Sequence, residues 1–400
     1  MNKYSEEQST IGNYCSVGDG AHASIKKTER GVPYITAKNI LGGRLEIDTV
    51  AYISENDFAK HFKMDSKAMG RPQHNDVIFS IIGTIGQAYV VQENDRFGMS
   101  SSVAMLRPNT ASLTPHYLYY WITGPVFQNE LYGIKGGVAQ GYVSLEMIKS
   151  LSLAAPPLPT QQKIASILSA YDDLIENNNR RIQILEEMAQ GIYREWFVHF
   201  RFPGHENVNM VDSELGKIQE GWAVSLVENA IDRYRPGKLF SQKTVKEYGK
   251  VPVLDQGRSG IIGYHDEAPG VDASVADPII VFANHTCYQR LILFPFSAIQ
   301  NVLPFKSNSQ LKRDLFWLHY STKDLVEFND YKGHWPEFIS KKIVVPSIEY
   351  CDKFGELLRP IYEMLNHFES KNQALRKTRD LLLPRLISGR LDVEELDIEV

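Results

Sequence analysis

The chain has few cysteines and no long apolar run. Three cysteines occur in 400 residues, at positions 15, 287 and 351, and they are too few and too scattered for a disulfide framework or a four-ligand zinc site. No stretch approaches the roughly 18 apolar residues of a membrane span, and the polar start MNKYSEEQST lacks the apolar stretch of a signal peptide. We therefore expect a cytoplasmic protein whose cysteines are core residues and that has no membrane partner.

Catalytic motifs are also missing. There is no GxxxxGK[ST] phosphate loop, since Gly237 and Lys238 are followed by Leu239, and there is no HExxH, CxxC or GxSxG. The histidines are dispersed, and an isolated histidine is more often a surface or core residue than a ligand. We therefore predict no catalytic residue, no metal site and no cofactor bound by this chain.

Positive charge is not in excess. The formal net charge is −5, and none of the segments 1–155, 156–202, 203–345 and 346–400 has more basic than acidic residues. A nucleic-acid surface would therefore be a local patch, and a second macromolecule could supply part of the phosphate neutralisation.

What the chain does have is a long amphipathic helix, predicted from Gln161 to Phe200. Prolines 156, 157 and 159 precede it, and Thr160 is positioned to cap it. A continuous helix of this length would extend about 60 Å at roughly 1.5 Å per residue, which indicates a spacer. Its apolar residues form one seven-residue row and a neighbouring row; these are Ile164, Tyr171, Leu185 and Ile192, then Ile167, Leu174 and Met188.

Asn178 lies on the first of these rows. A polar residue there either sets the register of a helix pair or faces water at a slight stutter in the pattern. The sequence leaves both readings open.

The same pattern returns 190 residues later, which indicates a duplication. The proline entry is repeated along with the helical row; the matched pairs are Pro156 and Pro346, Lys163 and Lys353, Ile164 and Phe354, Ile167 and Leu357, Leu168 and Leu358, Tyr171 and Ile361, Leu185 and Leu375, and Ile192 and Leu382. We expect the second helix, 348–389, to kink or break at Pro360 and Pro384.

The segments before each helix also resemble one another. In 1–155 we predict a strand within 31–40, two strands within 75–91 joined through Gly83 and Gly86, and a helix within 114–124 capped by Thr114. Segments starting at 251, 277, 315 and 331 repeat this plan.

The fold class is therefore α+β, with two similar mixed α/β domains and two long helices. The domains are 1–155 and 203–345, the central long helix is 156–202, and the distal long helix with the tail is 346–400. Two equivalent helices bury their apolar rows most simply as an antiparallel coiled coil, which would give approximate two-fold symmetry.

Two similar modules on a rod suit duplex DNA with two half-sites. The candidate contacts are basic and amide side chains, because Arg pairs with guanine, Asn or Gln with adenine, and Lys with phosphate. In the first domain they are Lys26, Lys27, Arg30, Lys38, Asn39 and Arg44, and in the second Arg233, Arg235, Lys238, Lys243, Gln256 and Arg258. The alternative is an ordinary solvated charged face.

Lys135 belongs to a glycine-rich stretch, GIKGGVAQG at 133–141, that could let backbone approach a phosphate. An ordinary turn explains it equally simply.

These residues together resemble a known family, the specificity subunit of Type I restriction-modification systems. The segment PPLPTQQKIASILSAYDDLIENNNRRIQILEEMAQGIYREWFV is similar to its central conserved region, and LRKTRDLLLPRLISGRLDV at 375–393 to its distal one. VGDGAHASI at 17–25 and the segments starting at 31 and 76 are similar to the opening of a target recognition domain. In the second domain RYRPGKLFS at 233 is only a weak counterpart of that opening.

The resemblance implies that each domain is a target recognition domain that reads half of a bipartite double-stranded DNA target. It also implies that the helices set the spacing and dock two modification subunits, which use S-adenosylmethionine to methylate adenine, while restriction subunits use ATP and Mg. The chain itself would be non-catalytic. The alternative is a coiled-coil scaffold or adaptor whose end domains bind proteins.

Overall fold

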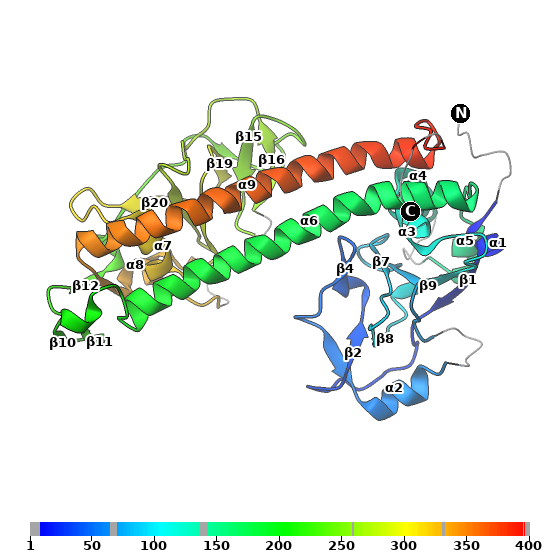
Figure 1. The fold of residues 1–400 in the computed structure, drawn as a ribbon, viewed down its shortest axis with the longest axis horizontal. Helices are drawn as coiled ribbons and strands as arrows, with labels where there is room; N and C mark the ends of the chain where they lie inside the picture. Colours follow the sequence, from blue (N-terminus) through cyan, green and yellow to red (C-terminus); the bar gives the residue numbers. More distant parts are fainter. Residues whose placement is uncertain are drawn as a thin grey trace. The chain divides into compact units, whose positions relative to one another are not determined.

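The computed structural model describes residues 9–64, 70–136, 143–257, 260–329, 333–394 and 396, with Lys135 described through its backbone only. They form two compact units, one made of Met1–Glu176 with Asn372–Val400 and the other of Asn177–Lys371. Two long helices, α6 (Leu158–Tyr193) and α9 (Ile348–Ile387), each contribute to both units (Figure 1). We call residues 9–155 module 1 and residues 203–345 module 2.

Module 1 contains two main sheets. The first has the order β1-β9-β6-β7 with antiparallel neighbours, from β1 (Cys15–Asp19), β9 (Val103–Pro108), β6 (Val77–Ser80) and β7 (Ala88–Val90). In the second, β2 (Val32–Ile35) pairs antiparallel with β5 (Ala51–Ile53) and parallel with β8 (Gly98–Met99). The other elements are α1 (Ile11–Tyr14), β3 (Ile40–Leu41), β4 (Arg44–Leu45), α2 (Glu55–His61), α3 (Pro115–Thr123), α4 (Pro125–Gly136) and α5 (Leu145–Ser150). The predicted strands and helix are confirmed.

Module 2 repeats both sheets. The order β13-β20-β17-β18, again antiparallel, uses β13 (Ile231–Arg233), β20 (Val302–Ser307), β17 (Ile279–Ala283) and β18 (Gln289–Ile292). In the other sheet β15 (Val251–Leu254) pairs antiparallel with β16 (Ile261–His265) and parallel with β19 (Ser297–Ile299), to which β14 (Leu239–Phe240) is added. The other elements are β10 (Met210–Ser213), β11 (Gly216–Gln219), β12 (Ala223–Leu226), α7 (Leu315–Thr322), α8 (Trp335–Ser340) and β21 (Lys342–Val345). The shared order confirms the repeated plan.

The strand order also places the weak counterpart of the first module's opening. β13 pairs with β20 as β1 pairs with β9. RYRPGKLFS therefore leaves β13 where DGAHASI leaves β1, although the two sequences have little in common.

Each unit closes its core with residues from both long helices, which run antiparallel within it. In the first unit Lys163 Nζ donates to the backbone oxygens of Glu394 and Leu396, at 2.9 and 2.7 Å, and Asp172 pairs with Arg379. In the second unit the guanidinium of Arg181 lies 5.5 Å from the ring centroid of Phe368. The ring of Tyr193 lies 6.1 Å from that of Phe354.

A tyrosine anchors each module to a long helix at the same place in the repeat. The hydroxyl of Tyr120 in α3 donates to Asp172 of α6 over 2.6 Å. The hydroxyl of Tyr320 in α7 is 2.9 Å from that of Tyr362 in α9. Residues 172 and 362 are 190 positions apart, the spacing of the helix repeat, so the anchor survived the duplication with changed chemistry.

The helix ends differ from the prediction. α6 begins at Leu158, with Pro159 in its first turn, where a missing N–H costs nothing. Thr160 is therefore inside the helix and does not cap it. α6 ends at Tyr193, before a π-helical turn, Arg194–Val198.

α9 does not break at its prolines, so of the two predicted outcomes, a kink or a break, the break is excluded. It continues through Pro360 and Pro384 as one helix of 40 residues. Each proline removes only one N–H, and the turns beside it are held by burial of Leu358 and Leu386, both 0% exposed.

The buried face of α6 also differs in part. Leu174 and Met188, predicted for the second apolar row, are 46% and 51% exposed, and Leu168 and Ala189 are buried instead. Asn178 is 4% exposed, which excludes the reading in which it faces water.

Thr114 and the glycine-rich stretch also depart from expectation. Thr114 precedes α3, but its hydroxyl makes no capping bond; its N–H donates to Oε1 of Gln161 over 2.9 Å. Gly133 and Gly136 belong to α4 rather than to a loop, and residues 137–142 lie outside the described part of the chain.

The duplication supplies a matched pair of substitutions that tests burial. Asp76, 1% exposed, accepts from Nε and Nη2 of Arg107 at 2.8 and 2.7 Å, and Asp277, whose side chain is 72% exposed, pairs with Lys306 at 2.7 Å. We expect Asp76→Asn to cost about 2–4 kcal/mol of unfolding free energy, because it leaves a half-buried guanidinium unpaired. Asp277→Asn should cost at most about 1 kcal/mol. Urea unfolding measures the loss of unfolding free energy for each variant. Equal losses would contradict the conclusion that burial makes the first ion pair more important for stability than the second.

A buried histidine predicts acid sensitivity of the second unit. His319 in α7 is 5% exposed, Gln289 Nε2 donates to its backbone oxygen over 2.8 Å, and burial lowers the pKa of His319 to about 3. The unfolded state therefore binds a proton that the folded state does not, so stability should fall as pH drops from about 6.5 towards 3. The loss should reach about 2–3 kcal/mol at pH 4.5. His319→Gln should flatten this slope in urea unfolding from pH 7 to 4.5, whereas the exposed control His367→Gln should keep it.

Candidate nucleic-acid interface

The candidate contacts of module 1 begin where β1 ends. Gly20 is required there, because a Cβ at this position would lie 2.2 Å from the backbone oxygen of Ser100. Asp19, before it, accepts from the ring of His22, whose Nε2 lies 2.7 Å from Oδ2. The side chain of Asp19 is 12% exposed and that of His22 is 67% exposed, so a fixed carboxylate orients an outward-facing imidazole.

The three predicted basic residues on the next segment are all exposed. These are Lys26, Lys27 and Arg30. Lys27 Nζ lies 3.2 Å from the ring centroid of Tyr34 in β2, and partial burial lowers the pKa of this lysine. The segment therefore places cations and an imidazole together next to the smaller sheet.

The other candidates of module 1 have different surroundings. Lys38 is exposed on a 3-10 turn, Ala37–Asn39. Arg44 forms an ion pair with Glu176 of α6. The side chain of Lys135 lies outside the described part of the structure.

Asn39 has a structural role. It is 5% exposed, and its Oδ1 accepts from the N–H and hydroxyl of Thr36 at 3.0 and 2.8 Å, while Nδ2 donates to the backbone oxygen of Glu46 at 3.1 Å. Bidentate pairing with adenine needs both the oxygen and the nitrogen of the amide. In this conformation Asn39 shapes the turn. It does not face outward, so the prediction that it reads a base is not supported.

In module 2 the basic candidates begin at the last residue of β13, Arg233. Arg233 lies over the ring of Trp335 at 5.7 Å, Arg235 and Lys243 are exposed, and Lys238 forms an ion pair with Glu267. This segment therefore corresponds in position and in charge to the one that follows β1.

Gln256, like Asn39, holds local backbone. Its Oε1 accepts from the N–H of His285 over 2.9 Å, which ties the end of β15 to the turn between β17 and β18. Arg258 lies outside the described residues.

Two exposed side chains were missed. His22 has a signal in the sequence, an aspartate three residues before it with a glycine between them, which had been noted only as part of the family-like opening. Tyr248 is 76% exposed and is flanked in the sequence by Lys243, Lys246 and Lys250, a mixture of basic and aromatic residues typical of nucleic-acid surfaces.

The His, Cys, Asp and Glu side chains of the described ranges are not grouped as a metal centre would need. Within them, no group of three or more His, Cys, Asp or Glu side chains could hold a metal ion. Cys15 and Cys351 are buried, as predicted, and burial raises the pKa of the Cys15 thiol to about 12. Cys287 is only partly buried, which corrects its assignment to the core. No helix in this part of the chain is long and apolar enough to cross a membrane.

The fold and these surfaces define a class of two-module proteins in which each module presents a basic segment and is completed by shared long helices. Residues 7–187 match the family model described as the Type I restriction modification DNA specificity domain. The Type I restriction enzyme MjaIX specificity subunit of Methanocaldococcus jannaschii is 27% identical over 311 residues, covering 70% of each chain. The putative type I restriction enzyme MjaX specificity subunit of the same organism is 24% identical over 404 residues, covering 94% of this chain and 91% of the relative.

A solved structure shares the fold. The S subunit of a Type I restriction-modification system from M. genitalium aligns with a TM-score of 0.55 at 16% sequence identity, over 95% of both chains. Together with the sequence matches, this identifies the chain as a relative of Type I restriction-modification specificity subunits, and the recognition made from the sequence is confirmed.

Proposed function

We propose that this chain is the DNA-specificity subunit of a Type I restriction-modification complex, in which each module reads one half of a bipartite target. The observation that carries the proposal is the repeated sheet order of the two modules, each with a basic segment leaving its first strand. The family match over residues 7–187 supports DNA as the ligand. Of the basic candidates we retain Lys26, Lys27, Arg30 and Lys38 in module 1, and Arg233, Arg235, Lys238 and Lys243 in module 2.

The long helices would set the spacing of the half-sites and dock two modification subunits. Seven large apolar side chains on α6 and α9 are 46–57% exposed, namely Leu174, Ile184, Met188, Ile348, Leu357, Met364 and Leu381. Leu174 and Met364 are 190 residues apart, the spacing of the repeat. This pair places an exposed apolar side chain at the same position of both helices, which suits a partner that is present in two copies.

We assign the chemistry to the partners. S-adenosylmethionine and adenine methylation belong to the modification subunits, and ATP and Mg to restriction subunits. The net charge of −5 supports shared phosphate neutralisation, because this chain alone offers only local basic patches.

Methylation sequencing tests this function. Cells that carry the chain with its modification subunit should show adenine methylation at one bipartite motif, and exchanging residues 1–155 with those of a relative should change one half of the motif only. Adenine methylation that is unchanged after deletion of the chain would favour the scaffold alternative.

The spacer role makes a separate prediction. Adding one heptad to both α6 and α9 lengthens each by about 10 Å, or roughly three base pairs, while preserving their pairing. The motif should keep both halves and gain a longer unspecified gap. Adding the heptad to α6 alone should abolish methylation, because the paired rows lose register.

The salt dependence of DNA binding tests the basic segment of module 1. In the assembled methyltransferase, Lys26→Ala with Arg30→Ala should weaken DNA binding and reduce the slope of log K against log salt by about 2. Lys217→Ala removes an exposed positive charge from β11 and should leave the slope unchanged. Equal slopes for all three proteins would remove this segment from the interface.

A further inference from the structure

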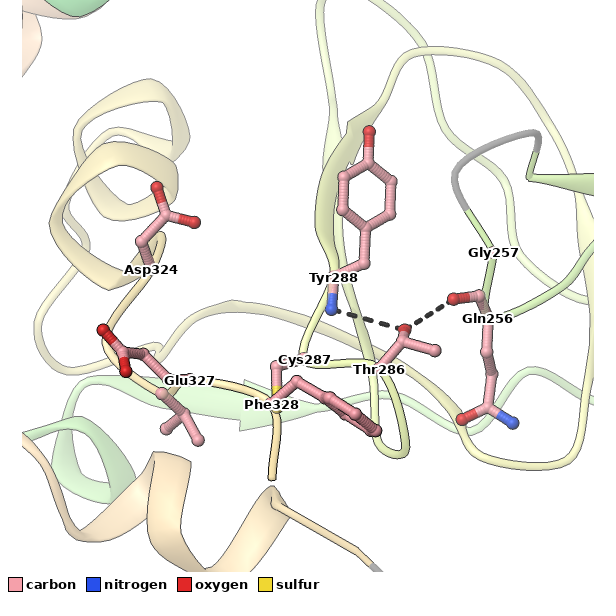
Figure 2. Close-up of a pocket in the computed structure, with 9 residues that line it drawn as sticks. Gln256, Gly257, Thr286, Cys287, Tyr288, Asp324, Glu327 and Phe328 are labelled. Carbon is pink, nitrogen blue, oxygen red and sulfur yellow. Dashed lines mark hydrogen bonds between the residues drawn. The ribbon is translucent and has the colours of Figure 1, made fainter. Parts of the chain in front are cut away.

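Module 2 contains a cavity of about 430 Å³ beside the turn that joins β17 to β18 (Figure 2). One wall is this turn and the end of β15, and the other is the segment that follows α7. The lining residues are Gln256, Gly257, Thr286, Cys287, Tyr288, Asp324, Val326, Glu327 and Phe328.

The corresponding place in module 1 is filled. Gly86 and Cys287 occupy equivalent positions. Each has a positive φ, 86° and 57° respectively. The backbone oxygen of the residue after each accepts a hydrogen bond from the N–H of the last residue of the preceding strand. In module 1, Nε2 of Gln128 in α4 donates to the backbone oxygens of Gly86 and Ile122, at 3.0 and 2.7 Å. An amide from the chain itself therefore occupies this position with two hydrogen bonds.

Module 2 has no counterpart of α4 in its described residues. After α7 ends at Thr322, residues 323–329 continue without a helix, and four of them, Asp324, Val326, Glu327 and Phe328, line the cavity instead. Among the described residues, the place of this hydrogen-bond donor is therefore open to a group from outside them.

The lining indicates the charge of that group. Asp324 and Glu327 lie on the same side of the cavity. Phe328, which is 64% exposed, also lines the cavity. Carboxylates accept hydrogen bonds from cations, and aromatic faces attract them. The nine lining residues include no lysine or arginine, so a phosphate would meet repulsion and a guanidinium or ammonium group attraction.

A cationic side chain of the protein itself already contacts one of the aromatic rings of the lining. The guanidinium of Arg290 lies 5.8 Å from the ring centroid of Tyr288 and donates to the backbone oxygen of Asp255 over 3.1 Å. It is held outside the lining, which leaves Phe328 and both carboxylates for a ligand.

We propose that this cavity binds an arginine or lysine side chain of a modification subunit. The inference rests on the proposed function, and it selects protein over DNA because the walls are acidic. It also makes the two modules unequal, since only module 2 offers this contact.

The test compares two double variants of the full chain. Asp324→Asn with Glu327→Gln removes both cavity carboxylates, and asparagine tolerates the positive φ of 60° at position 324. Asp212→Asn with Glu228→Gln removes the same charge from exposed positions elsewhere in the second unit. Calorimetry measures binding of the purified modification subunit, and thermal unfolding checks that all variants fold.

We expect the cavity variant to bind the modification subunit at least tenfold more weakly and the control to match the wild-type chain. Phe328→Ala should weaken binding several-fold, and DNA affinity of the complex at saturating modification subunit should be unchanged. Unchanged subunit affinity would overturn the proposal. Loss of DNA affinity with intact assembly would do so as well, since the cavity would then face DNA. A wild-type chain that binds no modification subunit would instead refute the proposed function itself.

Discussion

Burial of apolar residues from both long helices is the interaction on which the rest of the structure depends. The core of the first unit contains Ile164 and Leu168 of α6 together with Leu386 and Ile387 of α9. The core of the second contains Leu185 and Ala189 of α6 together with a set from α9, namely Phe354, Leu358, Leu365 and Phe368. Neither module therefore completes its core with its own residues alone. The proposed spacing role and folding are linked, because the helices that would separate the half-sites also complete the cores of the two modules.

The duplication preserved positions more strictly than chemistry. A tyrosine-to-carboxylate hydrogen bond at Tyr120 and Asp172 corresponds to a tyrosine pair at Tyr320 and Tyr362. The buried ion pair of Asp76 with Arg107 corresponds to an exposed pair of Asp277 with Lys306. What the fold requires at these sites is a contact between two elements, and several side-chain pairs supply it. Substitutions that keep the contact can therefore accumulate while the framework persists.

Functional divergence appears where no such contact is required. The segment that leaves the first strand carries an oriented histidine in module 1 and an arginine over Trp335 in module 2. The β6–β7 turn of module 1 is held by a hydrogen bond from Gln128. The corresponding β17–β18 turn of module 2 borders a cavity instead. Loops tolerate such change because they contribute little to the core, and they are where the proposed reading of two different half-sites would need variety.

The sequence by itself determined the duplication, the two long helices, the main strands of module 1 and the family. Each of these depends on a period or a local pattern that neighbouring residues specify. It did not determine that α9 continues through Pro360 and Pro384, that Leu174 is exposed, or that the amide of Asn39 faces inward. Those outcomes depend on which distant residues cover a turn or accept a hydrogen bond. The cavity is the clearest case, because it exists only where β15, the β17–β18 turn and the segment after α7 meet without a counterpart of α4. Only tertiary packing decides whether such a space is filled.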